Sequence, residues 1–355
     1  MSKTKRTSSK IVNWYLKNAR DLPWRKTTDP YKIWISEVVL QQTTVKQGTN
    51  YYLRFIKAFP NIKKLATADI DKVLKLWQGL GYYSRARNLH AAAQFIYNEN
   101  KNVFPNSYEE IIKLKGVGPY TAAAVSSFAF ELPHVVVDGN VLRLFSRLYG
   151  IKEAIDINST KTKIQKLAQH LLEKEKASTF NQAIMELGAM VCTYKNPLCV
   201  SCPLNKMCLA YKNEDISRIP FKSKKIIRKD RYFKYFFISD TKGNTIIEKR
   251  KGKDIWQGLY QLPLQECLNM EEKADLPLDI KKISNISEIV PSKIYKQNLT
   301  HQTIYAQFHK IYLNNTLKKN TFDDPYVVIP IEKLNNYAWP KILDLYLNDL
   351  SITLF

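Results

Sequence analysis

Apolar residues recur three and four positions apart through most of the first two hundred residues of the chain. Two such series are Leu89, Ala92, Ala93 and Ile96, and Ile164, Leu167, Ala168, Leu171 and Leu172. This spacing places the apolar side chains on one face of an α-helix. Strand-like patterns are rare here, and the run Val135–Val137 is too short to need a sheet. The pattern therefore predicts a helical domain over residues 10–211.

The pattern changes at about residue 231, where aromatic and β-branched residues take over. A turn-like segment, 241–244, separates the first two of four strand-like runs, which are Tyr232–Ile238, Thr245–Glu248, Tyr305–Tyr312 and Tyr326–Ile329. Runs of this kind, bounded by turn residues, predict β-strands. We therefore expect a separate α+β domain over residues 231–355.

Basic residues crowd the junction between the two predicted domains. Eight Lys and Arg residues stand against one acid, Asp230, between Arg218 and Lys234. Such a run is most often a solvated linker, although it could equally lie along a phosphate backbone. We predict a linker over residues 212–230.

The amino-acid composition also indicates what kind of partner the protein binds. The 355 residues include 55 Lys and Arg against 32 Asp and Glu, which gives a net charge of +23. This excess predicts a polyanionic partner, and no apolar stretch approaches the ~20 residues of a membrane-spanning helix. Residues 1–9 are basic and lack the apolar segment of a secreted chain, so a solvated arm is predicted there. We expect a cytoplasmic monomer that works on nucleic acid and not on membranes.

Four of the five cysteines fall in one stretch, with the spacing C-x6-C-x2-C-x5-C: Cys192, Cys199, Cys202 and Cys208. In a reducing compartment, clustering of this kind indicates metal ligation rather than disulfides. One tight C-x2-C flanked by single cysteines can wrap a compact object such as an iron–sulfur cluster. A four-cysteine zinc site is the alternative.

A glycine pair forms a second candidate feature. Gly116, Val117 and Gly118 follow an apolar helical run and precede Pro119, which suits the first turn of a new helix over residues 120–130. The free N–H groups at that helix start can hold a phosphate without reading a base. This is the helix-hairpin-helix pattern of non-specific DNA binding, and an ordinary helix–helix turn is the alternative.

Two carboxylic acids are candidates for chemistry. Asp138 follows an apolar run and directly precedes a helix predicted over residues 141–148, so it could stabilise positive charge on a sugar or merely cap that helix. Glu37 shares a helix face with Trp34 and Leu40. Desolvation among such neighbours would raise its pKa and make it a general acid. A partly exposed helical Glu is the alternative.

Taken together, several segments resemble the adenine DNA glycosylase (MutY) family, within the endonuclease III-like helix-hairpin-helix superfamily. The resemblance runs from about Leu22 to Cys208. It is carried by Leu22–Arg25, Ser36–Thr43, Gly79–His90, Gly116–Tyr120, Val137–Val141 and the four cysteines. It implies an all-α helix-hairpin-helix glycosylase domain whose loop 192–208 binds a 4Fe–4S cluster, and an enzyme of base excision repair. Its implied partner is double-stranded DNA with adenine opposite 8-oxoguanine or guanine, which would associate the protein with the nucleoid.

The resemblance also implies roles for single residues. Glu37 looks like the acid that protonates adenine at N7, and Asp138 like the carboxylate that stabilises the sugar cation, with Asn140 and Tyr120 orienting them. The adenine pocket would comprise Trp24, Arg25, Leu40 and Gln182, of which Trp24 and Leu40 could instead be core. Gln42 and Tyr82 would be wedges inserted beside the lesion pair. Leu80 and Thr43 would also lie against 8-oxoguanine. Because bifunctional relatives carry a Lys where this chain has Tyr120, we predict base excision without efficient strand cleavage.

The C-terminal domain resembles, less specifically, the Nudix-like domain that recognises 8-oxoguanine in this family. It lacks the Glu-rich box of true Nudix hydrolases, so pyrophosphatase activity is not expected. Thr300 and His301 would form the recognition loop, where many members have Phe-Ser-His. Two rival functions stay open: a bifunctional endonuclease III-like pyrimidine-damage glycosylase/lyase, and a non-enzymatic iron–sulfur DNA-binding module.

Overall fold

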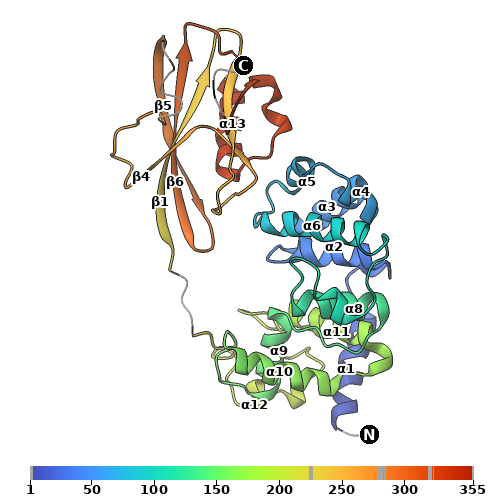
Figure 1. Cartoon of the computed structure of the whole chain (residues 1–355). Helices are drawn as coiled ribbons and strands as arrows, with labels where there is room; N and C mark the ends of the chain where they lie inside the picture. Colours follow the sequence, from blue (N-terminus) through green and yellow to red (C-terminus); the bar gives the residue numbers. More distant parts are fainter. Residues whose placement is uncertain are drawn as a thin grey trace. The chain divides into compact units, whose positions relative to one another are not determined.

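The computed structural model describes residues 3–223, 227–277, 283, 285–318, 322 and 324–353 (Figure 1). The chain divides into two compact units, one of residues 1–67 and 91–225 and one of residues 68–90 and 226–355. Among the described residues, no helix is both long and apolar enough to cross a membrane. Each unit is built around its own core.

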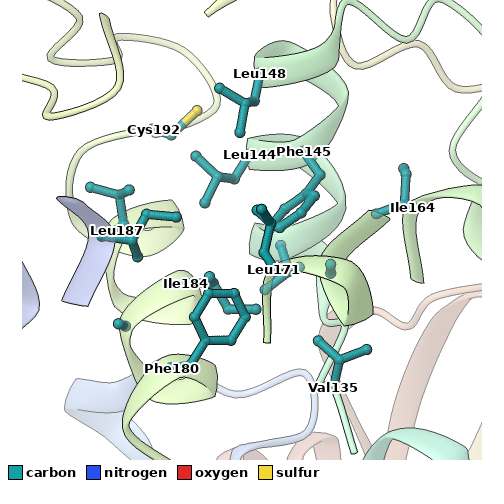
Figure 2. Close-up of a cluster of buried hydrophobic side chains, with 14 of the residues drawn as sticks. Val135, Leu144, Phe145, Leu148, Ile164, Leu171, Phe180, Ile184, Leu187 and Cys192 are labelled. Carbon is teal, nitrogen blue, oxygen red and sulfur yellow. The ribbon is translucent and has the colours of Figure 1, made fainter. Parts of the chain in front are cut away.

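The first unit is helical, as predicted. Its helices are α1 (Lys3–Asn18), η1 (Pro23–Arg25), α2 (Pro30–Leu40), α3 (Val45–Ala58), α4 (Ile62–Ala66), α7 (Tyr108–Ile111), α8 (Pro119–Phe130), α9 (Gly139–Tyr149), α10 (Asn158–Leu171), η2 (Lys174–Lys176), α11 (Ala177–Met190), η3 (Asn205–Met207) and α12 (Leu209–Lys212). One core cluster joins α9, α10 and α11, and Figure 2 shows Leu144 and Phe145 of α9 beside Ile184 of α11. Ile164, Ala168 and Leu171 of the second periodic series lie on the buried face of α10, and Leu172 follows as its C-cap.

Residues 3–9 differ from the solvated arm that the sequence predicted. They form the first turns of α1, in which Thr7 and Ser8 are buried. The physical reason is the apolar face that follows, because Ile11 and Tyr15 join the core and α1 packs against α11. Because that apolar face packs against the core, the helical turns before it also lie against the protein. Lys10 Nζ, for example, donates to the carbonyl of Pro203.

The second unit contains two sheets. Its strands are β1 (Lys229–Ser239), β2 (Asn244–Lys249), β3 (Tyr260–Gln261), β4 (Leu264–Cys267), β5 (Ile286–Asn298), β6 (Gln302–Leu313) and β7 (Tyr326–Pro330). One sheet has the order β4-β1-β6-β5 and the other β3-β2-β7, with β1 and β6 parallel and the remaining pairs antiparallel. With η5 (Ile331–Asn336) and α13 (Lys341–Thr353), this is the predicted α+β architecture.

The turn at residues 241–244 joins the two sheets and does not close a hairpin. Strand β1 bonds to β4 and β6, which uses both of its edges, so β2 pairs elsewhere. Part of the predicted linker, including Lys224 and Lys225, lies outside the described residues. The domain limits 10–211, 212–230 and 231–355 stay a prediction.

Residues 68–90 group with the sheets and not with the other helices. They include α5 (Ile70–Trp77) and the first turns of α6 (Ser84–Asn98). Asp71 accepts from Tyr260 Oη at 2.8 Å and pairs with Lys249, while Lys75 Nζ donates to the carbonyl of Tyr337 at 2.8 Å. The second unit is therefore assembled from two distant parts of the sequence.

Candidate active site

Glu37 lies near the end of α2, a helix that is apolar on nearly every side. Asp29 caps its start by accepting from the N–H of Tyr31, and most of its residues are buried. Glu37 is 5% exposed, and Tyr120 Oη donates to its Oε2 at 2.8 Å. Burial raises the pKa of Glu37 to about 7, against a smaller lowering effect from the Tyr120 hydrogen bond. This carboxyl group can therefore hold a proton near neutral pH.

Asp138 is both a helix cap and a member of the same site. As the N-cap of α9, its carboxylate accepts from Val141 N and from Asn140 Nδ2, each at 2.7 Å. Burial raises the pKa of Asp138, while these two hydrogen bonds oppose the rise. Asn140 is fixed in turn by Arg143, which donates to its Oδ1 at 2.9 Å. Asp138 can therefore cap α9 and also take part in the candidate site.

One cavity of about 300 Å³ brings the two carboxyl groups together. Its walls include Glu37 and Asp138 and also the residues expected to bind adenine: Trp24, Arg25, Leu40 and Gln182. Tyr120, Asn140 and Thr43 line it as well. Trp24 serves the core at the same time, since its ring meets Tyr52 edge-on at 5.4 Å. A cavity of this size can hold a small planar ligand.

A wider recess of about 550 Å³ is also lined by Glu37 and Asp138. Leu40, Gln42 and Tyr120 contribute to its walls. Gln42, expected to wedge into the duplex, has φ of 55°, an uncommon conformation for a residue other than glycine. The candidate catalytic groups are thus reached from a broad opening as well as from the narrower cavity.

The glycine hairpin leads into α8. Gly116 has φ of 81°, which favours glycine, and the N–H of Val117 donates to the carbonyl of Leu114 at 3.0 Å. Gly118 is the N-cap of α8, with Pro119 as the first helical residue. A Cβ at Gly118 would meet nothing within 4 Å, so the structure leaves open space in front of the helix start. This geometry suits the approach of a phosphate.

Four residues expected at the lesion pair meet in the second unit. A recess of about 500 Å³ is lined by Leu80, Tyr82, Thr300 and His301, together with residues 254–257. Tyr82 Oη is hydrogen-bonded to Thr300 Oγ1, and Tyr82 has φ of 48°. The other two residues of the expected lesion group, Gln42 and Thr43, belong to the first unit.

The four clustered cysteines line one cavity whose other walls are largely apolar. Leu144 and Leu148 of α9 and Leu204 contribute to it. Within the described residues, no three His, Cys, Asp or Glu side chains gather closely enough for a single metal ion. Four cysteine thiols around one cavity are a donor set that suits an iron–sulfur cluster.

Arg147 is the charged residue behind this cavity. It is 2% exposed and donates to Cys192 Sγ at 3.5 Å and to the carbonyl of Thr193 at 2.6 Å. Backbone carbonyls of residues 194, 216 and 219 accept its other hydrogen bonds. Thiolates at this cavity would in addition offset its positive charge.

Sequence reasoning missed a buried group in the cavity wall. Glu186 lines the cavity and pairs with both Arg20 and Arg25. The signal available was its position on α11, four residues after Gln182, which places both side chains on one helical face. Without the cavity on that face, the spacing alone did not distinguish Glu186 from a surface residue.

Two family profiles match the chain. One, described as HhH-GPD superfamily base excision DNA repair protein, matches residues 35–174, and the other, described as NUDIX domain, matches residues 234–349. The chain is 40% identical over 306 residues to the adenine DNA glycosylase of Buchnera aphidicola subsp. Baizongia pistaciae (strain Bp), covering 83% of each. It is 42% identical over 216 residues to the adenine DNA glycosylase of Mus musculus, covering 57% of this chain and 41% of the mouse protein.

Solved structures are similar to the helical part. A thermostable thymine-DNA glycosylase matches with a TM-score of 0.55 and 29% identity, covering 59% of this chain and 97% of the other. A non-covalent endonuclease III–DNA complex matches with a TM-score of 0.52 and 22% identity, covering 61% and 99%. At the latter identity the likeness concerns the fold alone. The helical part therefore has an endonuclease III-like fold.

Proposed function

The chain belongs to the adenine DNA glycosylase family, and we propose that it excises adenine opposite 8-oxoguanine or guanine from double-stranded DNA. The observation that carries the proposal is one base-sized cavity that both Glu37 and Asp138 line, with Glu37 hydrogen-bonded to Tyr120. A base inside a duplex cannot reach such a cavity, so adenine must first be flipped out of the stack.

Glu37 is the general acid of this proposal. Its raised pKa keeps a proton on the carboxyl group, and that proton passes to N7 of the flipped adenine. The C1′–N9 bond then breaks, its electron pair leaves with adenine, and an oxocarbenium-like sugar remains. Tyr120 orients the Glu37 carboxyl group through its hydroxyl.

Asp138 stabilises the sugar cation, either electrostatically or through a transient covalent adduct. Water completes the hydrolysis at C1′ and returns a proton to the carboxylate of Glu37, following the two-carboxylate logic of glycoside hydrolysis. Asn140 holds Asp138 through the 2.7 Å hydrogen bond to its carboxylate. Asp138 thus acts from a fixed position at the start of α9.

Base excision proceeds without efficient strand cleavage in this proposal. A lyase needs an amine for Schiff-base formation, and the phenol of Tyr120 at this position of the hairpin cannot supply one. Gly116, Val117 and Gly118 hold the DNA backbone at the start of α8. Arg25, Trp24, Leu40 and Gln182 bind the flipped base.

Recognition of the opposite base falls to residues of both units. Tyr82 and Leu80, with Thr300 and His301, line one recess in the second unit, and the hydroxyl of Thr300 can hydrogen-bond a lesion. In the first unit, Gln42 is the wedge residue and Thr43 lies against 8-oxoguanine. We also propose that Cys192, Cys199, Cys202 and Cys208 hold a 4Fe–4S cluster. Bound there, the cluster would cross-link loop 192–208 beside α9 through the four thiolates.

Single-turnover release of adenine tests the reaction. Duplexes that differ only in the base opposite adenine, 8-oxoguanine, guanine or thymine, are compared with wild-type protein and Glu37→Gln. We expect release opposite 8-oxoguanine and guanine by wild type, and none by Glu37→Gln, which still binds DNA. Appreciable release by Glu37→Gln would contradict the role of this residue.

Borohydride treatment tests the rival function of a bifunctional glycosylase/lyase. A stoichiometric covalent enzyme–DNA adduct after reduction would favour a bifunctional glycosylase/lyase, whereas absence of product from every duplex would favour a DNA-binding module. Replacement of the exposed Lys115, adjacent to the hairpin, is the matched control for binding. It should weaken DNA binding without changing the rate of release from bound DNA.

A further inference from the structure

Glu186 is the buried centre of a charged cluster, formed with Arg20 and Arg25, in the lining of the cavity. Its side chain is 1% exposed and accepts three hydrogen bonds from Arg20: from N at 2.9 Å, Nε at 2.8 Å and Nη2 at 2.6 Å. It accepts two more from Arg25, from Nη1 at 3.0 Å and Nη2 at 2.8 Å. Burial alone would raise the pKa of Glu186, but these donors outweigh it and bring the pKa to about 2. Glu186 is therefore ionised.

The cluster holds one wall of the cavity. Arg25 lines the cavity, is 15% exposed and is anchored further by donating to the carbonyl of Arg20 at 3.2 Å. The guanidinium of Arg25 also lies over the ring of Tyr15, whose hydroxyl donates to Gln182 Oε1 at 2.8 Å. Two polar residues of the cavity lining are thus held in place: Arg25 by Glu186, and Gln182 by Tyr15.

The cluster also contributes, through Arg25, to the charge near the acid. Two guanidinium groups and one carboxylate leave a single net positive charge. The titratable groups that face Glu37 are Tyr120 from α8, Asp138 from the start of α9 and Arg25 from η1. Glu131 and the cluster itself complete the ionisable lining of the cavity. Arg25 is the cation among the groups acting on Glu37, and the carboxylate bonded directly to that cation is Glu186.

We propose that Glu186 is a positioning residue of adenine excision: it holds Arg25 against the cavity wall and offsets the positive charge that Arg25 directs at Glu37. This inference rests on the function proposed above. Without Glu186, two guanidiniums would face the site unopposed, the proton on Glu37 would be held less firmly, and Arg25 would lose its anchor.

Charge and packing can be separated with two variants of opposite sign. Glu186→Gln keeps the shape and raises the net charge of the cluster by one, whereas Arg20→Gln lowers it by one. The pH dependence of single-turnover adenine release is measured for both. The cation effect predicts that the alkaline limb moves to lower pH in Glu186→Gln and to higher pH in Arg20→Gln.

The expected size follows from one charge near a buried acid. We expect a displacement of about one pH unit for Glu186→Gln, so release at pH 8 falls roughly tenfold while release at pH 5.5 changes less than about threefold. Arg20 is 35% exposed, so its variant should move the limb by roughly half a unit or less. The double variant should place the limb between those of Glu186→Gln and wild type, roughly half a unit below wild type.

The matched control is Glu153→Gln, which removes the same charge from a surface ion pair with Lys163. It should leave the pH profile unchanged. The inference is overturned if the two variants Glu186→Gln and Arg20→Gln move the alkaline limb in the same direction, or if neither moves it. A purely structural role would not make the direction depend on the charge removed. If Glu186→Gln does not fold, the direction seen with Arg20→Gln alone decides.

Failure of the proposed function gives a different result. Wild-type protein that releases adenine from no duplex rejects the function itself, whereas wild type that releases adenine with unmoved variants rejects only the role of Glu186.

Discussion

At the scale of the residue, two buried glutamates of one cavity are driven to opposite protonation states by their partners. Glu37 meets one hydroxyl donor, which does not compensate its desolvation, so its pKa rises to about 7. Glu186 meets two guanidiniums, which more than compensate, so its pKa falls to about 2. Burial alone therefore does not decide the charge of an acid; the number and charge of its donors do.

Protonation of Glu37 couples stability to pH. Because its folded pKa lies above the unfolded value, the folded state keeps a proton that the unfolded chain releases between about pH 4.5 and 7. The associated stabilisation is present below this window and is lost as pH rises through it. Glu37→Gln should therefore match wild type in unfolding free energy near pH 4 and exceed it by roughly 3 kcal/mol at pH 8. Denaturant unfolding at both pH values checks this, and a constant difference would contradict it.

The two roles of Asp138 can be separated by the choice of substituent. Asn is as good an N-cap as Asp, so Asp138→Asn should keep the stability of α9 while losing the negative charge and most of the excision rate. Asp138→Ala should lose the rate and also about 1 kcal/mol of stability. Thermal unfolding and single-turnover release together test this, and equal destabilisation by both variants would show that the cap is not the structural role.

At the scale of the element, α9 and α11 are pressed together where α9 begins. A Cβ at Gly188 of α11 would lie 2.8 Å from the carbonyl oxygen of Asn140 and 2.9 Å from its Cβ. Arg143 binds both partners, donating to the carbonyl of Gly188 at 2.6 Å and to Asn140. This close approach holds Asn140 in place, and Asn140 in turn holds Asp138.

Gly188→Ala should therefore push α9 away from α11. We expect a loss of about 1–3 kcal/mol of stability and a fall in excision rate that exceeds the effect on DNA affinity, because Asn140 moves with the helix start. The matched control is Gly252→Ala, where an added Cβ meets nothing within 4 Å. A stable Gly188→Ala protein with the wild-type rate would contradict the argument.

At the scale of the whole molecule, a net charge of +23 dominates the encounter with DNA. Each phosphate contact releases counterions, so the logarithm of the affinity should fall linearly with the logarithm of salt concentration. With six or more contacts, affinity should drop at least about a thousandfold between 50 and 200 mM salt. Titration with labelled duplex measures the slope, and Lys115→Gln should reduce it by about one. A flat salt dependence would argue against a phosphate-dominated interface.

The sequence by itself determined features that depend on local pattern. Helix periodicity, the strand-like runs, the glycine hairpin and the cysteine spacing each lie within a short stretch of sequence, so the helical and α+β parts were predictable. The pairing of Glu37 with Tyr120, 83 positions apart along the chain, rested on family resemblance, because no local pattern places two such residues together.

Only the tertiary structure decided which distant groups became partners. The salt bridges of Glu186 to Arg20 and Arg25, the assignment of β1 and β2 to different sheets, and the grouping of residues 68–90 with the second unit all involve long separations. Even the start of α1 was set by packing against α11 and not by its own polar sequence. Local pattern determines which side of a helix or strand is apolar. The contacts that shift the pKa of a buried acid form only when those apolar sides pack together.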